Sequence, residues 1–249
     1  MLTCIKKQVP SFIIAGGRVC LFTAFFVPLP TIMIVENMNL HEIYANLMGD
    51  MTKLNWKRDT LFRKAFNEIK KSTEFPAFIM YDYKVPSSNN QYIIYFFMEH
   101  PMGPVIADIL FIVFDDNQRF IVKWTDKGIP EVHILTSHFL QRYKERFLKL
   151  PELTANEVAV RYFARNSIMR PMNINERINK HIKKHGEFAG EGFLVQDGFS
   201  FKLSGEESIE GEKQPVRISL YTTFMPRSEM TENQREAIFE ECMKDLDRL

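Results

Sequence analysis

Hydrophobic and polar residues follow two different periods along the chain after Met38. From Leu40 to about Lys71 the apolar residues recur every three or four positions, which predicts an amphipathic helix. Four runs rich in aromatic and β-branched residues then predict strands at Ala77–Lys84, Gln91–Met98, Val105–Phe114 and Arg119–Trp124. Turn-forming breaks separate these runs, so the strands are expected to form an antiparallel meander. The runs at 91–98 and 109–114 are almost wholly apolar, which is typical of strands buried on both faces.

The second half of the chain alternates helices with strands. A short strand at 132–135 runs into a helix that Thr136 or Ser137 would cap. Capping boxes at Thr154–Glu157 and Thr231–Gln234 predict two more helices, one ending near Arg165 and one continuing to the chain end. The other expected elements are a helix over 174–185 that stops at Gly186, a hairpin of 192–195 and 199–203 turned at 196–198, and a strand at 216–224.

These elements predict an α+β fold, with an antiparallel sheet and the helices segregated to one side. Residues 38–131 would contribute the first helix and the meander. Residues 132–249 would contribute the central helices, the late strands and the C-terminal helix. The two parts form either one domain or two β-containing halves around the helices of 137–186.

Residues 1–37 do not resemble the rest of the chain, because 12–35 is dominated by apolar residues behind two lysines. Three interpretations stay open. The segment is a signal peptide, although no small-x-small cleavage site follows it. It is a membrane-spanning anchor, although Arg18 lies inside it and two prolines interrupt its end. Alternatively, native translation starts at Met38 and the segment is an upstream extension of a cytoplasmic protein.

Composition narrows the chemistry. The 249 residues carry a net charge of +1 and only three cysteines, Cys4, Cys20 and Cys242. This number excludes a disulfide framework and a cysteine-ligated zinc site, and it favours a reducing compartment. His181 and His185 have ligand spacing but no evident third ligand, so no metal and no cofactor is expected.

Charge is distributed unevenly along the chain. Residues 139–186 hold eleven Lys or Arg and four acids, or 11 − 4 = +7, whereas 187–249 hold seven basic and fourteen acidic residues, or 7 − 14 = −7. Such a basic segment followed by an acidic one fits an anion or nucleic-acid site that the tail masks. The alternative is that the two regions pack against each other.

Within the basic segment, His138, Arg142 and Arg146 are spaced four residues apart on the helix expected after Thr136. This spacing places an imidazole and two guanidinium groups along one ridge at the border of the apolar face. Three alternatives stay open for the anion beside the ridge: Glu145, which would make the ridge a solvated surface, a carboxylate elsewhere in the chain, or a bound phosphate.

The order of residues around this ridge resembles that of small toxin-like domains in the barnase/EndoU/colicin/RelE superfamily of metal-independent ribonucleases, which are bacterial or phage proteins. The matching positions, about a third of the chain, are Ile134, Thr136, His138, Arg142, Arg146, Leu153, Thr154, Glu157 and Val158. This chain departs from the small toxins in its long β-rich first half, its third helix and its acidic C-terminal helix.

The resemblance implies an endoribonuclease in which the RNA 2′-hydroxyl attacks the adjacent phosphorus. It assigns His138 as general acid or base, and Arg142 and Arg146 as the groups that stabilise the pentacoordinate phosphate. Tyr221, Thr222 or Thr223 would supply a hydroxyl from the late strand. RNA and a neutralising or regulatory protein are the partners that it implies.

A non-catalytic binding protein is the alternative. In that case the basic 139–186 segment contacts nucleic acid or an acidic protein surface. The residues expected to make these contacts are Lys149, Arg161, Arg165, Lys183 and Lys184.

Overall fold

The structure is a computed structural model that describes residues 40–115, 118–125, 130–173, 191–210 and 212–246. The apolar segment 1–37 and the helix expected over 174–185, with Lys183 and Lys184, lie outside these ranges. Among the described residues, no helix has the length and apolar character needed to cross a membrane.

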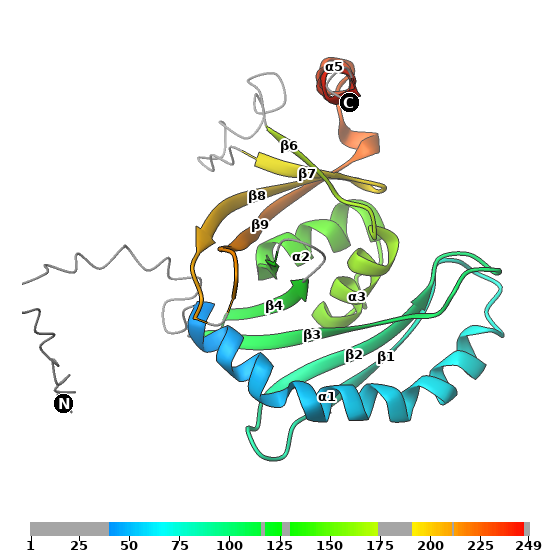
Figure 1. The fold of residues 1–249 in the computed structure, drawn as a ribbon. Coiled ribbons are helices and arrows are strands. Elements are labelled where there is room, and N and C mark those ends of the chain that lie inside the picture. Colours follow the sequence, from blue (N-terminus) through cyan, green and yellow to red (C-terminus); the bar gives the residue numbers. More distant parts are fainter. Residues whose placement is uncertain (1–39, 116–117, 126–129, 174–190, 211, 247–249) are drawn as a thin grey trace, which may run out of the picture. The chain divides into compact units, whose positions relative to one another are not determined.

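The order of elements follows the α+β expectation (Figure 1). The helical elements are α1 (Leu40–Ile69), α2 (Ser137–Tyr143), a π-helical turn η1 (Lys144–Leu148), α3 (Ala155–Arg165), a 3-10 turn η3 (Arg227–Glu229) and α5 (Glu232–Leu246). The strands are β1 (Ala77–Lys84), β2 (Gln91–Met98), β3 (Ile106–Asp115), β4 (Gln118–Thr125), β5 (Glu131–Leu135), β6 (Arg170–Asn173), β7 (Glu191–Val195), β8 (Gly198–Glu207) and β9 (Val216–Pro226). The strand β6 was not expected, because its four residues carry no alternating pattern.

The strands of the described residues form one sheet, in the order β1-β2-β3-β4-β5-β9-β8-β7-β6. The predicted antiparallel meander is confirmed for β1 to β5, and β9, β8, β7 and β6 form a second antiparallel group. A parallel pairing of β5 with β9 joins the groups. The two predicted halves therefore share a single sheet.

Helices cover both faces of this sheet, and the expectation that they lie on one side is wrong. Alternate residues of β2 show this arrangement: Ile93 and Tyr95 pack in the cluster formed with α2 and α3, whereas Tyr92 packs in the cluster formed with α1. A strand that is apolar at successive positions needs cover on both faces, because its side chains alternate between them. The both-face burial predicted for β2 and β3 is thus confirmed.

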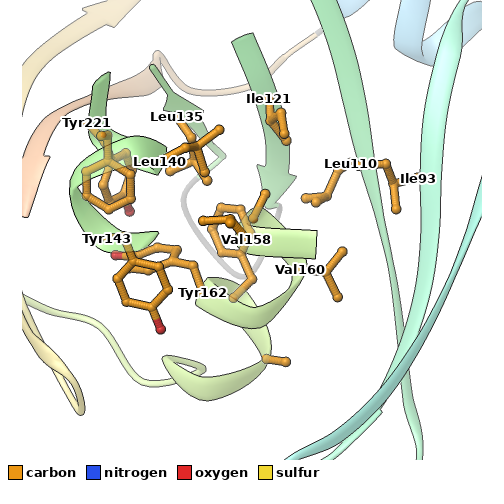
Figure 2. Packing of buried hydrophobic residues seen from close by; sticks show 14 of the residues in the cluster. Ile93, Leu110, Ile121, Leu135, Leu140, Tyr143, Val158, Val160, Tyr162 and Tyr221 are labelled. Carbon is orange, nitrogen blue, oxygen red and sulfur yellow. The ribbon is translucent and has the colours of Figure 1, made fainter. Parts of the chain in front are cut away.

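The larger core lies between the sheet and the helices α2 and α3 (Figure 2). Figure 1 shows these helices between β1–β4 and β7–β9, so the sheet curls around them. Buried aromatic rings lock the helices together: Tyr162 lies edge-to-face with Phe139 and Tyr143, at ring-centroid distances of 5.0 and 5.2 Å. Such pairs add about 0.5–1.5 kcal/mol each beyond the area they bury.

Local sequence signals place the ends of the elements as predicted. Thr154 and Glu157 form the expected capping box at the start of α3. Thr231 and Gln234 exchange the same pair of contacts before α5. The β7–β8 hairpin turns at Gln196 and Asp197, and α5 packs against this part of the sheet in a separate small cluster.

The hairpin β7–β8 provides a test of close packing. A Cβ atom added at Gly192 would lie 2.1 Å from the Phe199 ring and 2.7 Å from the Ser200 carbonyl oxygen, whereas one added at Gly49 in α1 meets nothing within 4 Å. We expect Gly192→Ala to lower the free energy of unfolding by about 1–3 kcal/mol, through overpacking. Gly49→Ala should raise it by up to about 1 kcal/mol, because alanine favours the helix. Urea denaturation of both variants measures this contrast, and equal effects would contradict the register of β7 with β8.

Candidate functional site

The helix that carries His138 is bound to β9 through the residue that caps it, Thr136. The Thr136 hydroxyl accepts a hydrogen bond from the Phe139 N–H at 3.0 Å, which confirms it as the cap, and donates to the Tyr221 carbonyl at 2.9 Å. His138 lies in the first turn of α2 and is exposed. In the part of the chain that the structure describes, its side chain forms no hydrogen bond or ion pair.

The helix that carries the expected ridge is α-helical up to Tyr143 and then widens into the π turn η1. This turn ends at Lys149, which has a left-handed φ of 55°. Arg142 lies in the α-helix α2, whereas Arg146 lies within the π turn η1. Arg142 contacts the exposed Glu145 at 3.4 Å. Arg146 donates to the Phe224 carbonyl at 3.1 Å and lies 4.0 Å from Glu229.

The hydroxyl groups expected from β9 do not meet the ridge. Tyr221 is fully buried, and its hydroxyl contacts the His133 Nδ1 at 2.9 Å. Thr222 donates to the Phe201 carbonyl at 3.3 Å, and Thr223 is the register partner of Phe201. Among the described residues, no hydrogen bond joins these three side chains to His138, Arg142 or Arg146. Of the six residues predicted to be catalytic, Tyr221 therefore lies in the core, and His138 is exposed on α2.

A groove beside α2 also leaves the ridge outside. Its volume is about 620 Å³, and it lies between α2 with η1 and the start of α3. The lining residues are Ser137, Leu140, Gln141, Lys144, Glu145, Lys149, Leu150, Pro151, Ala155 and Val158. Since His138, Arg142 and Arg146 do not line it, this groove does not present a substrate to them.

The predicted nucleic-acid contacts have different surroundings. Lys149 is exposed at the end of η1. The Arg161 guanidinium lies over the Phe78 ring at 4.8 Å, and its buried Nε has no hydrogen-bond partner. Arg165 is half-buried and forms an ion pair with Asp197 at 2.9 Å. Three of these predicted residues lie in the described ranges. Of these three, Arg161 packs on an aromatic ring, Arg165 is bound by a carboxylate, and Lys149 is exposed to solvent.

Asp197 is the residue that sequence analysis identified only as part of a turn. Its side chain is 2% exposed, and Tyr143, Arg165 and Asn166 all donate to its carboxylate. The hydrogen bonds with Asp197 raise the pKa of Arg165. Burial, and then the charge of Asp197, hold the pKa of Tyr143 well above its usual value. The sequence shows Asp197 only as part of a Gln-Asp-Gly turn. Nothing in that pattern indicates that donors from two helices converge on its carboxylate.

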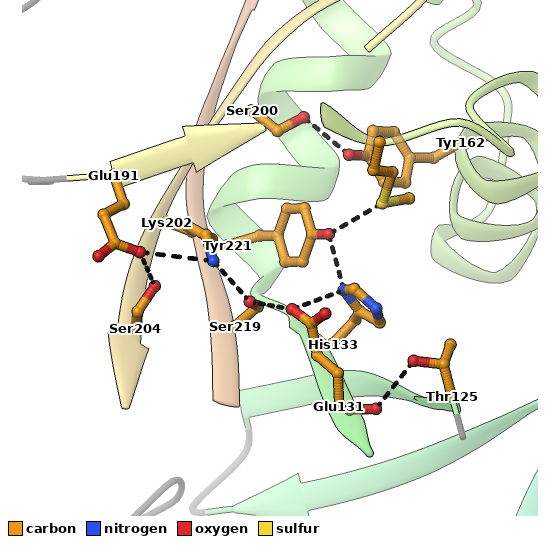
Figure 3. A network of polar contacts seen from close by, with 11 residues as sticks. Thr125, Glu131, His133, Tyr162, Glu191, Ser200, Lys202, Ser204, Ser219 and Tyr221 are labelled. Atoms are coloured by element: carbon orange, nitrogen blue, oxygen red, sulfur yellow. Dashed lines mark hydrogen bonds and ion pairs between the residues drawn. The ribbon is translucent and has the colours of Figure 1, made fainter. Parts of the chain in front are cut away.

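A second polar network crosses the sheet from β7 to β5 (Figure 3). Lys202 donates to the Ser219 hydroxyl at 3.0 Å, and Ser219 donates to Glu131 at 2.6 Å. Glu131 lies 3.8 Å from His133, which bonds to Tyr221. Burial, together with the charges of Lys123 and Lys202, lowers the pKa of His133 to about 3, so this imidazole is neutral at pH 7. Burial also lowers the pKa of Lys202.

Three arginines from separate segments line a cavity of about 500 Å³, which we call the arginine cavity. Arg165 comes from the end of α3, Arg170 from β6 and Arg227 from η3. The remaining lining residues are Phe75, Pro76, Glu99, Ala164, Ser167, Ile168, Leu194, Val195 and Gln196. Because they come from both ends of the sheet order, the cavity lies where the curled sheet brings β1 and β2 near β6 and β7.

The sequence predicted only one residue of this cavity, Arg165, as a binding residue. Arg170 was counted in the basic segment, and Arg227 falls in the acidic one. No local spacing connects the three, since Arg227 follows Arg170 by 227 − 170 = 57 residues. Comparisons with protein-family models, with curated proteins and with solved structures find no match to this chain.

The buried His133 predicts a specific loss of stability in acid. Its pKa is about 3 in the folded chain, whereas the ordinary pKa of histidine is 6.5, so its neutral form contributes stability above pH 6.5 that is lost as the pH falls toward 3. Between pH 6 and 4 this single site should reduce the free energy of unfolding by up to about 1.4 kcal/mol per pH unit. We expect His133→Asn to be less stable at pH 7 but to show a shallower decline in urea denaturation between pH 6 and 4. The exposed His138→Asn serves as the control, and an unchanged slope in the His133 variant would contradict the neutral buried state.

Proposed function

We propose that this protein binds RNA through the arginine cavity and the basic surface next to it. The arginine cavity is the observation that carries the proposal, because arginines from three separate segments and one carboxylate, Glu99, line it. A planar guanidinium fork matches the geometry of phosphate oxygens and retains its charge at every physiological pH. The cavity suits a phosphate-bearing ligand, because the oxygens of a phosphate can accept hydrogen bonds from arginines of separate segments.

The basic surface extends from the cavity to the π turn η1. Arg146 contacts the Phe224 carbonyl and Glu229, which lie on either side of Arg227 in the chain. Lys149 is exposed at the end of the same turn. An RNA backbone that enters the cavity would therefore continue along the cations outside it. Contacts between phosphates and Lys or Arg supply much of the affinity of proteins for nucleic acid.

Contacts within the protein fix the orientation of the arginine groups. Asp197 binds the Nε and Nη2 edge of Arg165, which directs Nη1 away from this carboxylate. Arg170 donates to the Cys242 carbonyl at 3.0 Å, and Arg227 to the Val195 carbonyl at 3.4 Å. Such preorganisation reduces the conformational entropy that the side chains would lose when RNA binds.

Binding of a labelled single-stranded RNA to the full chain tests this proposal. We expect Arg227→Gln to weaken binding about tenfold, which corresponds to about 1.4 kcal/mol for a lost charged hydrogen bond. The control is Arg63→Gln, an exposed position on α1 at the other face of the sheet, which makes the same change in net charge. Fluorescence anisotropy at two salt concentrations measures both variants. An equal loss in both would reduce the interaction to non-specific attraction, and no binding by the parent would exclude the function.

The ribonuclease remains a second candidate, supported by the exposed His138 on the helix that also carries Arg142. The 2′-hydroxyl of RNA would be the nucleophile, with His138 as general acid or base and Arg142 on the phosphate. We expect the full chain to cleave labelled RNA in chelator and to leave 2′,3′-cyclic ends, and His138→Ala to abolish cleavage. Intact RNA with the parent, or equal cleavage by His138→Ala, would leave binding as the only function proposed.

A further inference from the structure

We infer that the outer side of α1 binds the headgroup layer of a membrane that contains anionic phospholipids. We call this surface the α1 face, and it consists of the exposed residues of 52–71. The helix α1 packs on the face of the sheet opposite to α2 and α3, so the α1 face is distinct from the arginine cavity at the end of α3. The inference does not depend on the RNA binding proposed above.

The helix α1 presents one long side to solvent. Ala65 and Ile69 are buried on its inner side, in the cluster formed with β1 and β2. Trp56, Arg63 and Lys70 follow at intervals of seven residues, or almost two turns, so they lie along the opposite side. Figure 1 shows α1 lying along the sheet, and no other described element covers this outer side. At 1.5 Å per residue, the stretch 53–69 offers a surface about 25 Å long.

Three large apolar side chains are exposed on this stretch. The exposed fractions are 67% for Trp56, 40% for Phe62 and 38% for Phe66. Phe62 lies against Phe96 of β2 at a ring-centroid distance of 6.0 Å and stacks with Phe66 at 6.2 Å. Among the described residues, the Trp56 ring has no aromatic partner and belongs to no core cluster. Tryptophan is enriched at the boundary between lipid headgroups and acyl chains, because its ring is apolar and its N–H is polar.

The α1 face is also basic. Residues 53–71 hold seven basic and two acidic residues, or 7 − 2 = +5. Among the described residues, only Arg58 of these seven cations has a carboxylate within ion-pair distance, that of Asp59 at 2.9 Å. Each Lys or Arg close to an anionic bilayer adds to the affinity for it, so the charge of this surface complements such a membrane. The seven basic residues are Lys53, Lys57, Arg58, Arg63, Lys64, Lys70 and Lys71.

An anionic bilayer fits this combination better than a nucleic acid does. An amphipathic helix that lies in a membrane interface places aromatic side chains among the headgroups, while the long stems of its lysines carry their charges to the lipid phosphates. Bases that stack on aromatic rings usually do so inside a groove that follows the strand. Trp56 lies instead on the outer side of a helix, where it meets a broad, flat partner most readily.

The experiment measures binding of the full chain to vesicles of phosphatidylcholine alone and of phosphatidylcholine with phosphatidylserine. In co-sedimentation we expect binding to the anionic vesicles to be at least tenfold tighter. Bromine-labelled lipid in the same vesicles should quench the fluorescence of Trp56. The chain has one other tryptophan, Trp124, which packs against Tyr44 at 5.0 Å on the inner side of α1. The quenching should therefore be absent in Trp56→Phe.

Matched variants locate the contact. Trp56→Ala should weaken binding to anionic vesicles at least tenfold, whereas Phe239→Ala, at a 65% exposed aromatic position on α5, should leave it unchanged. Lys70→Gln should weaken binding about fivefold. The control for its charge is Lys84→Gln, because Lys84 is exposed and alternates along β1 with Tyr83, which packs toward α1. Thermal unfolding of each variant checks that the fold is retained.

The outcomes are independent of the proposed RNA binding. Vesicle binding that survives both Trp56→Ala and Lys70→Gln would place the membrane contact in another segment and overturn the inference. Equal binding to both kinds of vesicle would overturn the recognition of anionic lipid, and binding to neither would overturn the whole inference. Loss of RNA binding in Trp56→Ala, without vesicle binding by the parent, would make the α1 face a nucleic-acid surface instead.

Discussion

The buried carboxylate of Asp197 is the interaction on which the arrangement of the helices depends. Its partners lie on α2, at Tyr143, and on α3, at Arg165 and Asn166, so a single turn residue links both helices to the β7–β8 hairpin. A buried charge is tolerated only when hydrogen-bond donors surround it. Removing one donor leaves part of the buried negative charge uncompensated. The aromatic core around Tyr162 packs the same helices through edge-to-face rings, and the hydrogen bonds to Asp197 add directional contacts between them.

The parallel pair β5–β9 has an equivalent role in the sheet. It joins the meander to the second group of strands, and the His133–Tyr221 hydrogen bond lies across it. Once the two groups are joined, the helices α2 and α3 fill the concave face and the sheet curls around them. The curl then brings the far ends of the sheet order together at the arginine cavity. The candidate site is thus a consequence of how the sheet closes on its helices.

The uneven charge along the chain has a partly structural explanation. Arg146 lies beside Glu229, and Arg170 binds the carbonyl of Cys242, so basic residues of 139–186 do contact the segment counted as acidic. The alternative in which the two regions pack against each other therefore holds for these contacts. The anion site belongs to the function proposed above.

The sequence was sufficient to predict the α+β class, the meander and the capped starts of α3 and α5, because hydrophobic period and capping are local and need no distant partner. It also identified Thr136 as a cap and β2 as a strand buried on both faces. Other features depend on the tertiary structure, namely the cover of both faces of the sheet by helices, the π turn that contains Arg146, and the burial of Tyr221. The same holds for Asp197 and for the meeting of Arg165, Arg170 and Arg227. These features depend on contacts between residues far apart in the chain, and neither spacing nor composition encodes such contacts.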